Sequence, residues 1–157
     1  MCANFRGVAQ LVVRMVRDHK AGSSSLPTPT KKKNFINFLR GEIMQHEMKL
    51  RAVYFDKIAL GEKVFEVRLN DEKRKAIAIG DTIVFRKLPE LEEKIRAVVT
   101  DLLYFKSFEE MAKNLSSTEI GFENCSERAI VDAYHEFYSV EDENKFGVLA
   151  IKVKCLK

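Results

Sequence analysis

A short stretch of the sequence combines three ionisable side chains whose chemistry is complementary. Residues 61–68 read GEKVFEVR, which gives the pattern G-x-K-x-x-E-x-R with Lys63, Glu66 and Arg68. The alternation of apolar and polar residues over 63–69 predicts a strand, so that Glu66 and Arg68, two residues apart, point to the same face. The long side chain of Lys63, at the turn before the strand, can reach that face as well. The sequence therefore predicts one groove lined by a lysine, an acid and an arginine.

Each of these residues suits a ligand that carries phosphate or a nucleobase. The planar guanidinium of Arg68 fits a phosphate or a base edge. Glu66 is suited to orient Arg68 or to accept hydrogen bonds from an exocyclic amine, and it is also a candidate general base. Lys63 is suited to bind phosphate, or to act as a nucleophile or base if burial lowers its pKa. The alternative is that this strand face is simply solvated and has no ligand.

Further candidates lie outside this pattern. Lys73, Arg74 and Lys75 form, with Arg68, the one basic cluster of residues 44–157, and they are suited to contact backbone phosphates of RNA. Tyr104 follows a predicted strand and is suited to stack on a base. By their spacing, most of the other aromatic residues are expected in the core, among them Tyr54, Phe55, Phe105, Phe108, Tyr134, Phe137 and Tyr138. His46 and His135 are isolated in sequence, which favours surface or capping roles.

The composition excludes several classes of protein. The three cysteines, Cys2, Cys125 and Cys155, form no C-x-x-C pair and stand near no histidine, so we expect neither a disulfide framework nor a zinc site. No motif for another metal or a cofactor is present. No apolar run approaches the ~20 residues that cross a bilayer, so we expect no membrane partner. These features indicate a soluble chain of a reducing compartment, and we expect it in the cytoplasm.

The predicted elements that must position the groove give an α+β order. Glycines and capping serines mark the element boundaries. The strands are not separated by helices in βαβ fashion, which disfavours a parallel sheet and favours a small, mostly antiparallel barrel, closed or half-closed, with flanking helices. The predicted strands are Met48–Val53, Lys63–Leu69, Thr82–Arg86, Lys94–Asp101 and Val148–Cys155, and the predicted helices are Tyr54–Leu60 and three that begin near Ser107, Asn124 and Ser139.

The first 43 residues differ in composition from the rest of the chain. They carry eight Lys or Arg against two Asp or Glu, whereas residues 44–157 carry nineteen against twenty-one, so the basic excess belongs to this leader. The segment rich in Ser, Thr and Pro over 23–30 predicts disorder. One interpretation is a basic arm that touches RNA. The other is a non-native leader from a start assigned too far upstream, because this stretch resembles a translated transfer-RNA gene and Met44 or Met48 offers a later start.

Residues 48–155 resemble the ASCH domain family. The resemblance rests on the G-x-K-x-x-E-x-R string, on Asn70-Asp71 after it, on the Gly80-Asp81 turn before a strand, and on the closing stretch FGVLAI over 146–151. The family is similar in fold to the PUA domain, an RNA-binding β-barrel. The resemblance implies a PUA-like barrel and a cleft lined by Lys63, Glu66 and Arg68.

The resemblance also implies a function, with an alternative. We expect binding of RNA or a nucleotide in the groove of Lys63, Glu66 and Arg68. The alternative is a hydrolase acting on RNA or on a modified nucleoside, because some family members are amidohydrolases that use a lysine, a threonine three residues later and a later glutamate. Lys63 matches that lysine, but Glu66 stands in place of the threonine, and either Glu119 or Glu123 would supply the later acid. A third class is a protein-interaction domain that uses the acidic helical face over 109–143.

Overall fold

The computed structural model describes residues 43–156, and these form one mixed α+β unit. The leader predicted over residues 1–43 lies, apart from Ile43, outside the described residues, so its proposed disorder and its proposed non-native origin stay predictions. Within the described part, no helix is both long and apolar enough to cross a membrane.

Strands and helices follow the predicted order with shifted ends. The first strand begins three residues earlier than predicted, and its predicted last residues belong instead to the following helix; the fourth strand runs on to Phe105. In chain order the elements are β1 (Gln45–Arg51), α3 (Ala52–Leu60), β2 (Phe65–Leu69), the 3-10 turn η1 (Arg74–Ala76), β3 (Thr82–Leu88), β4 (Lys94–Phe105), α4 (Phe108–Asn114), α5 (Glu127–His135), α6 (Val140–Phe146) and β5 (Val148–Cys155).

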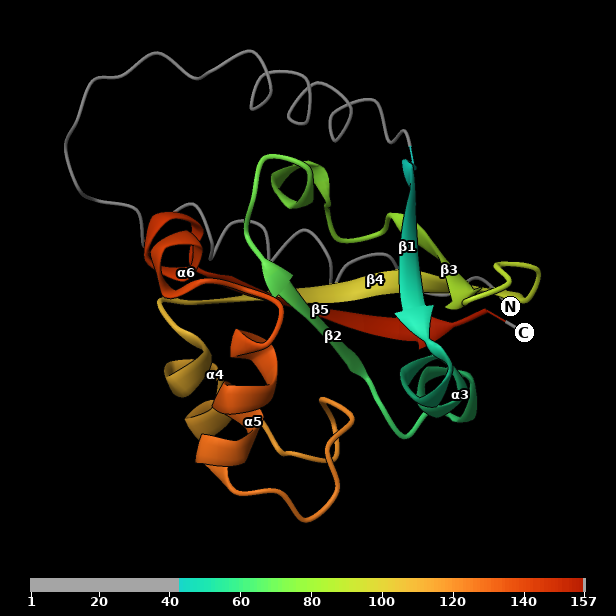
Figure 1. Cartoon of the computed structure of the whole chain (residues 1–157). Coiled ribbons are helices and arrows are strands. Elements are labelled where there is room, and N and C mark those ends of the chain that lie inside the picture. Colours follow the sequence, from blue (N-terminus) through green and yellow to red (C-terminus); the bar gives the residue numbers. More distant parts are fainter. Residues whose placement is uncertain (1–42, 157) are drawn as a thin grey trace, which may run out of the picture.

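The five strands form one curled sheet in the order β1-β3-β4-β5-β2. The β3–β4, β4–β5 and β5–β2 pairs are antiparallel, and the β1–β3 pair is parallel. A register shift between Val99 and Asp101 interrupts the long strand β4, as β-bulges do where a sheet bends. Figure 1 shows the two edge strands, β1 and β2, in front of β4 and β5, so the sheet is a half-barrel with an open side between its edges. The predicted fold class, a mostly antiparallel PUA-like barrel with helices, is confirmed.

Both faces of the sheet are covered, which gives the molecule two apolar cores. The inner core lies between the concave face and α3; the outer core lies under α4, α5 and α6. Strand β5 serves both, because Leu149, Ile151 and Val153 enter the inner core while Val148 and Ala150 enter the outer one. Both faces of β5 therefore contribute to a core.

Serine caps fix where the three C-terminal helices begin. The hydroxyls of Ser107, Ser126 and Ser139 accept from the backbone N–H groups of Glu110, Ala129 and Asp142 respectively. Each bond satisfies one N–H that the first helical turn leaves unpaired. The helix predicted to begin near Asn124 is capped by Ser126, two residues later, and begins at Glu127. These helices pack against β2 and bring α5, with the turn after it, to the open side of the half-barrel (Figure 1).

Candidate functional site

A pocket of about 270 Å³ opens where the edge strands β1 and β2 face helix α5. Its volume lies just below the range of about 300–1,000 Å³ that is usual for small-molecule sites. Its walls combine charged groups with aromatic rings. The charged side chains are Lys49, Arg51, Lys63, Glu66 and Arg68; the aromatic ones are Tyr54, Phe122, Tyr134, Phe137 and Tyr138; Leu50, Val67, Leu88 and Ala133 complete the lining.

Strand β2 places its charged residues on the inner face of the half-barrel. In the β2–β5 register, Glu66 lies opposite Ile151 and Arg68 lies opposite Leu149, and both β5 residues belong to the inner core. The apolar residues of β2 face the outer core instead. Glu66 is consequently only 4% exposed, so the alternative of a solvated strand face does not hold.

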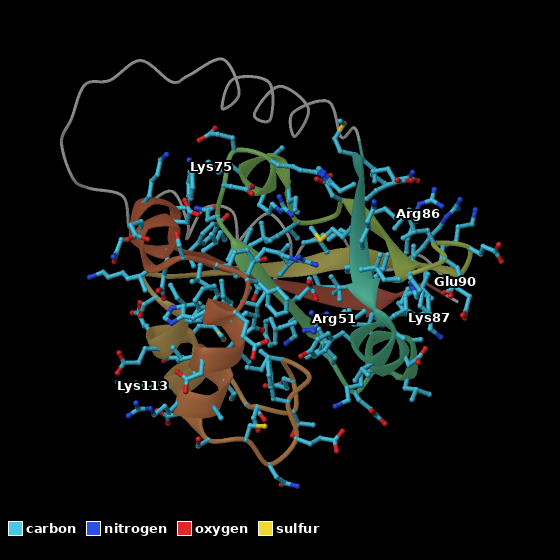
Figure 2. The ribbon with its side chains drawn as sticks, viewed as in Figure 1. Arg51, Lys75, Arg86, Lys87, Glu90 and Lys113 are labelled. Atoms are coloured by element: carbon cyan, nitrogen blue, oxygen red, sulfur yellow. The ribbon has the colours of Figure 1, made fainter. Side chains whose placement is uncertain are left out.

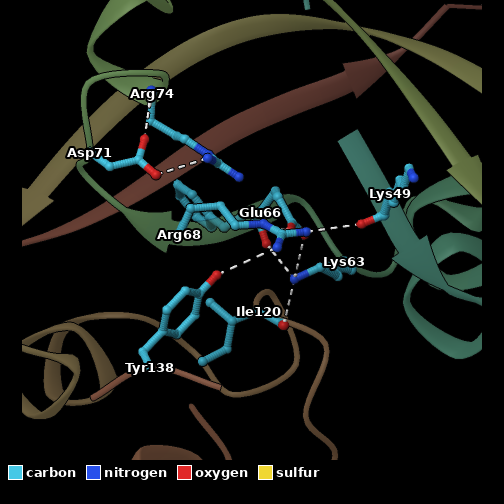
Figure 3. A network of polar contacts seen from close by, with 9 residues as sticks. Lys49, Lys63, Glu66, Arg68, Asp71, Arg74, Ile120 and Tyr138 are labelled. Carbon is cyan, nitrogen blue, oxygen red and sulfur yellow. Dashed lines mark hydrogen bonds and ion pairs between the residues drawn. The ribbon is translucent and has the colours of Figure 1, made fainter. Parts of the chain in front are cut away.

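Lys63 is buried and joins strand β2 to the segment before α5. Its Nζ donates to the carbonyl of Phe65 at 2.7 Å and to the carbonyl of Ile120 at 2.8 Å, and lies 3.4 Å from Glu66 Oε2 (Figure 3). An ammonium group has three N–H donors, so these contacts occupy all of them. Burial lowers the pKa of Lys63, and the attraction of Glu66 only partly offsets this effect. The lysine therefore acts as an internal bridge between β2 and the segment before α5.

Arg68 holds the two edges of the sheet together. Its Nε donates to Glu66 Oε1 at 2.8 Å, and one Nη donates to the carbonyl of Lys49 on β1 at 3.0 Å. The other Nη lies 3.4 Å from the hydroxyl of Tyr138, which follows α5 (Figure 3). Burial acts to lower the pKa of the Arg68 guanidinium, but the charges and hydrogen bonds of Glu66 and Tyr138 together outweigh this effect, so the pKa lies above its ordinary value. Arg68 thus closes the open side of the half-barrel behind the pocket.

The loop before α5 approaches the side chains of Lys63 and Tyr54 closely at Gly121. This residue has φ +93°, and a Cβ there would lie 2.9 Å from Lys63 Cδ and 3.1 Å from Tyr54 Cδ1. The carbonyl of Glu119 accepts from the N–H groups of Val64 and Phe65. Lysine and loop are therefore fitted to each other by backbone contacts as well as by the Lys63 ammonium.

Aromatic rings form the remaining wall, and sequence reasoning placed most of them in the core. Phe122 lies between Tyr54 and Tyr134, with ring centroids 6.0 Å and 5.7 Å away. Phe137 is 55% exposed and carries the guanidinium of Arg51 at 4.5 Å above its ring. The helical period does put Tyr134 and Phe137 on one face, but it cannot show that this face borders a pocket. Nothing in the sequence marked Lys49, Arg51 or Phe122.

Four of the predicted ligand-binding residues do not line the pocket. Arg74 pairs with Asp71 at 2.8 Å, and Lys75 pairs with Glu72 at 2.5 Å. Figure 2 shows Lys75 well apart from Arg51, which is at the pocket. The remaining two are Lys73, which is exposed beside η1, and Tyr104, which is 54% exposed on β4.

The two described histidines each contact a buried carboxylate. His46 Nε2 lies 2.8 Å from Asp81, which also accepts from two backbone N–H groups. His135 Nε2 lies 2.8 Å from Glu143, whose other oxygen accepts from the backbone N–H of Phe108 at the start of α4. Both contacts join chain segments and leave the pocket untouched. In residues 43–156, no group of three His, Cys, Asp or Glu side chains is placed to hold a metal ion.

Tyr134 provides a pH test of the pocket wall. Burial, together with the charge of Glu66, raises the pKa of Tyr134 well above its ordinary value. Above about pH 10 the unfolded chain releases this proton while the folded chain keeps it, so the free energy of unfolding must fall as pH rises. We expect the wild type to lose roughly 1 kcal/mol more than Tyr134→Phe between about pH 9 and pH 10.5 in urea denaturation. Equal losses in the two proteins would contradict the placement of this hydroxyl. Tyr104→Phe is the comparison and should show a smaller difference, because Tyr104 is half-exposed and burial raises its pKa less than that of Tyr134.

The curled five-stranded sheet, its flanking helices and the pocket at its open side define a PUA-like β-barrel domain. The chain belongs to the ASCH domain family, whose model matches residues 48–157. Among solved structures, it is similar to the crystal structure of hypothetical protein PH0355, with 34% identity over 72% of this chain and all of that one, and a TM-score of 0.66. It is also similar to the solution structure of protein PF0455 from Pyrococcus furiosus, with 31% identity, coverage of 73% and 99%, and a TM-score of 0.57. No curated protein matches.

Proposed function

We propose that this ASCH domain binds one nucleotide, free or within single-stranded RNA, with its base in the pocket behind Arg51. One observation carries the proposal: the ion pair between the buried Glu66 and the partly buried Arg68 faces an aromatic-walled pocket with room for about one nucleotide. Membership of a family with a PUA-like, RNA-binding type of fold supports it. A cytoplasmic location, where RNA and free nucleotides occur, fits the same proposal.

The walls supply the two interactions that a nucleotide needs. The rings of Tyr54, Phe122 and Tyr134 offer flat surfaces for a base, and such stacking contributes about 1–3 kcal/mol per base. Lys49 and Arg51 are the exposed cations of the lining, so a phosphate at the mouth can contact them while it stays hydrated. The base would lie inward and the phosphate outward.

The basic residues outside the pocket belong to the same proposal only for a longer RNA. Lys73, Arg74, Lys75 and Tyr104 would then contact neighbouring nucleotides, as predicted from the sequence. Residues 44–157 carry slightly more acidic than basic side chains, so no broad positive field favours long RNA. This charge balance favours recognition of a single nucleotide over extended backbone binding.

The hydrolase alternative has less support from the contacts. A lysine nucleophile needs a free amine, whereas the Lys63 ammonium uses its donors on two carbonyls and Glu66. Glu66 remains placed to act as a general base, because Arg68 holds its carboxylate in position at the pocket wall. Turnover is therefore an outcome that the binding experiment should record.

The test is calorimetric titration of the full chain with the four ribonucleoside 5′-monophosphates and with short single-stranded RNAs. We expect saturable binding that weakens with salt and that falls roughly tenfold or more in Arg51→Ala, which removes the cation at the mouth. Lys113→Ala is the matched control, because Lys113 is an exposed cation that pairs with Glu109 and lies away from the pocket (Figure 2). Absence of binding by every nucleotide and RNA would refute the proposal. Formation of a product would refute simple binding and favour the hydrolase alternative.

A further inference from the structure

The hydrogen-bonding state of Glu66 at the pocket wall determines what a ligand must present to it. Arg68 Nε occupies one site on Oε1, and Lys63 Nζ approaches Oε2 at 3.4 Å. A carboxylate has about four acceptor sites, two on each oxygen. Each oxygen of Glu66 thus keeps one acceptor site, and the described residues supply no further donor for either.

Arg68 adds donors directly beside this carboxylate. Its guanidinium has five N–H groups, of which three are used on Glu66, Tyr138 and the Lys49 carbonyl. Two N–H groups remain in a side chain that lines the same pocket. The wall therefore offers two adjacent acceptors on Glu66 with donors next to them on Arg68.

We propose that the pocket selects guanine, through paired hydrogen bonds from its N1–H and N2 amino group to Glu66 and from Arg68 to its O6. This inference rests on the proposed nucleotide-binding function. Guanine alone among the four bases has two neighbouring N–H groups on its pairing edge, followed by a carbonyl. Adenine and cytosine place a ring-nitrogen acceptor beside their amine, and uracil flanks its single N–H with two carbonyls.

The burial of Glu66 increases the discrimination between guanine and the other bases. A carbonyl or ring nitrogen facing the carboxylate would place two acceptors together in a site where Glu66 is 4% exposed, so little water can intervene. Leaving a buried polar group without a partner is costly. Lys63 and Arg68 hold the carboxylate in place from two sides, so Glu66 cannot rotate away to accommodate another base.

The first test needs no variant. The full chain is titrated with GMP, IMP, AMP, CMP and UMP; IMP is the matched ligand, because it differs from GMP only by loss of the N2 amino group. We expect GMP to bind about tenfold or more tightly than each of the others. Five-nucleotide oligouridines with and without one guanosine form the second arm. The same preference there assigns the ligand to RNA, and a preference confined to monophosphates assigns it to a free nucleotide.

The second test changes the acceptor. In Glu66→Gln one oxygen becomes an NH₂ donor, so the preference of GMP over IMP should disappear, while Glu62→Gln, an exposed change that leaves the lining intact, should keep it. Circular dichroism checks that each variant folds. If Glu66→Gln fails to fold, the comparison of GMP with IMP on the wild type still tests the inference. Binding of nucleotides without preference for GMP would overturn this inference and leave the proposed function. Absence of all binding would overturn both.

Discussion

Replacing Lys63 by methionine is expected to lower the free energy of unfolding by about 3–5 kcal/mol, the usual loss when one partner of a buried ion pair is removed. The side chain is 4% exposed, and its ammonium is the donor to the carbonyls of Phe65 and Ile120. Methionine fills similar space but donates nothing, so two carbonyls and part of Glu66 lose their partner inside the protein. Urea denaturation followed by far-ultraviolet circular dichroism measures the change.

Lys57→Met is the matched control for this prediction. Lys57 donates to the carbonyl of Gly121 at 3.0 Å in the same loop and pairs with Glu123, but Glu123 is 65% exposed. A pair at the surface contributes about 0–1 kcal/mol, and a hydrogen bond from a charged group such as the Lys57 ammonium contributes about 1.5–3 kcal/mol. The Lys57 side chain is 19% exposed, so water can replace part of the lost hydrogen bond, and Lys57→Met should cost less than Lys63→Met. If Lys63→Met cost no more than Lys57→Met, Lys63 would not be the internal bridge that its contacts indicate.

Gly121→Ala is expected to lower stability by about 2–5 kcal/mol and to weaken ligand binding at the same time. At φ +93° an L side chain costs about 1–2 kcal/mol, and forcing a methyl group against packed atoms costs about 1–3 kcal/mol more. The atoms it would meet belong to Lys63 and Tyr54, both of which line the pocket. The measurements are urea denaturation and nucleotide titration of the same variant.

Gly61→Ala separates the two causes. Gly61 ends α3 with φ +80°, but a Cβ there would have no neighbour within 4 Å. This variant should therefore show only the backbone cost of about 1–2 kcal/mol and should bind nucleotides as the wild type does. Equal stability losses in the two variants would argue against the close fit of the loop to Lys63.

Local signals in the sequence were sufficient for most of the fold. The capping serines marked the starts of α4 and α6, and Gly61 marked the end of α3, because these signals act through bonds within a few residues. The strand alternation also put Glu66 and Arg68 on one face. The parallel pairing of β1 with β3 was not predictable in this way, because an intervening strand and helix separate the partners in the chain.

The sequence by itself determined the order of the elements, the family resemblance and the grouping of Lys63, just before one strand, with Glu66 and Arg68 on it. Only the tertiary structure decided that this charged face turns into the half-barrel, where β5 pairs with β2 and Ile120, far along the chain, completes the contacts of Lys63. Likewise, only packing brought Tyr134 and Phe122 from the helical region to the same pocket. The physical reason is that alternation specifies two faces of a strand, whereas burial of each face depends on which distant segments the curled sheet brings against it.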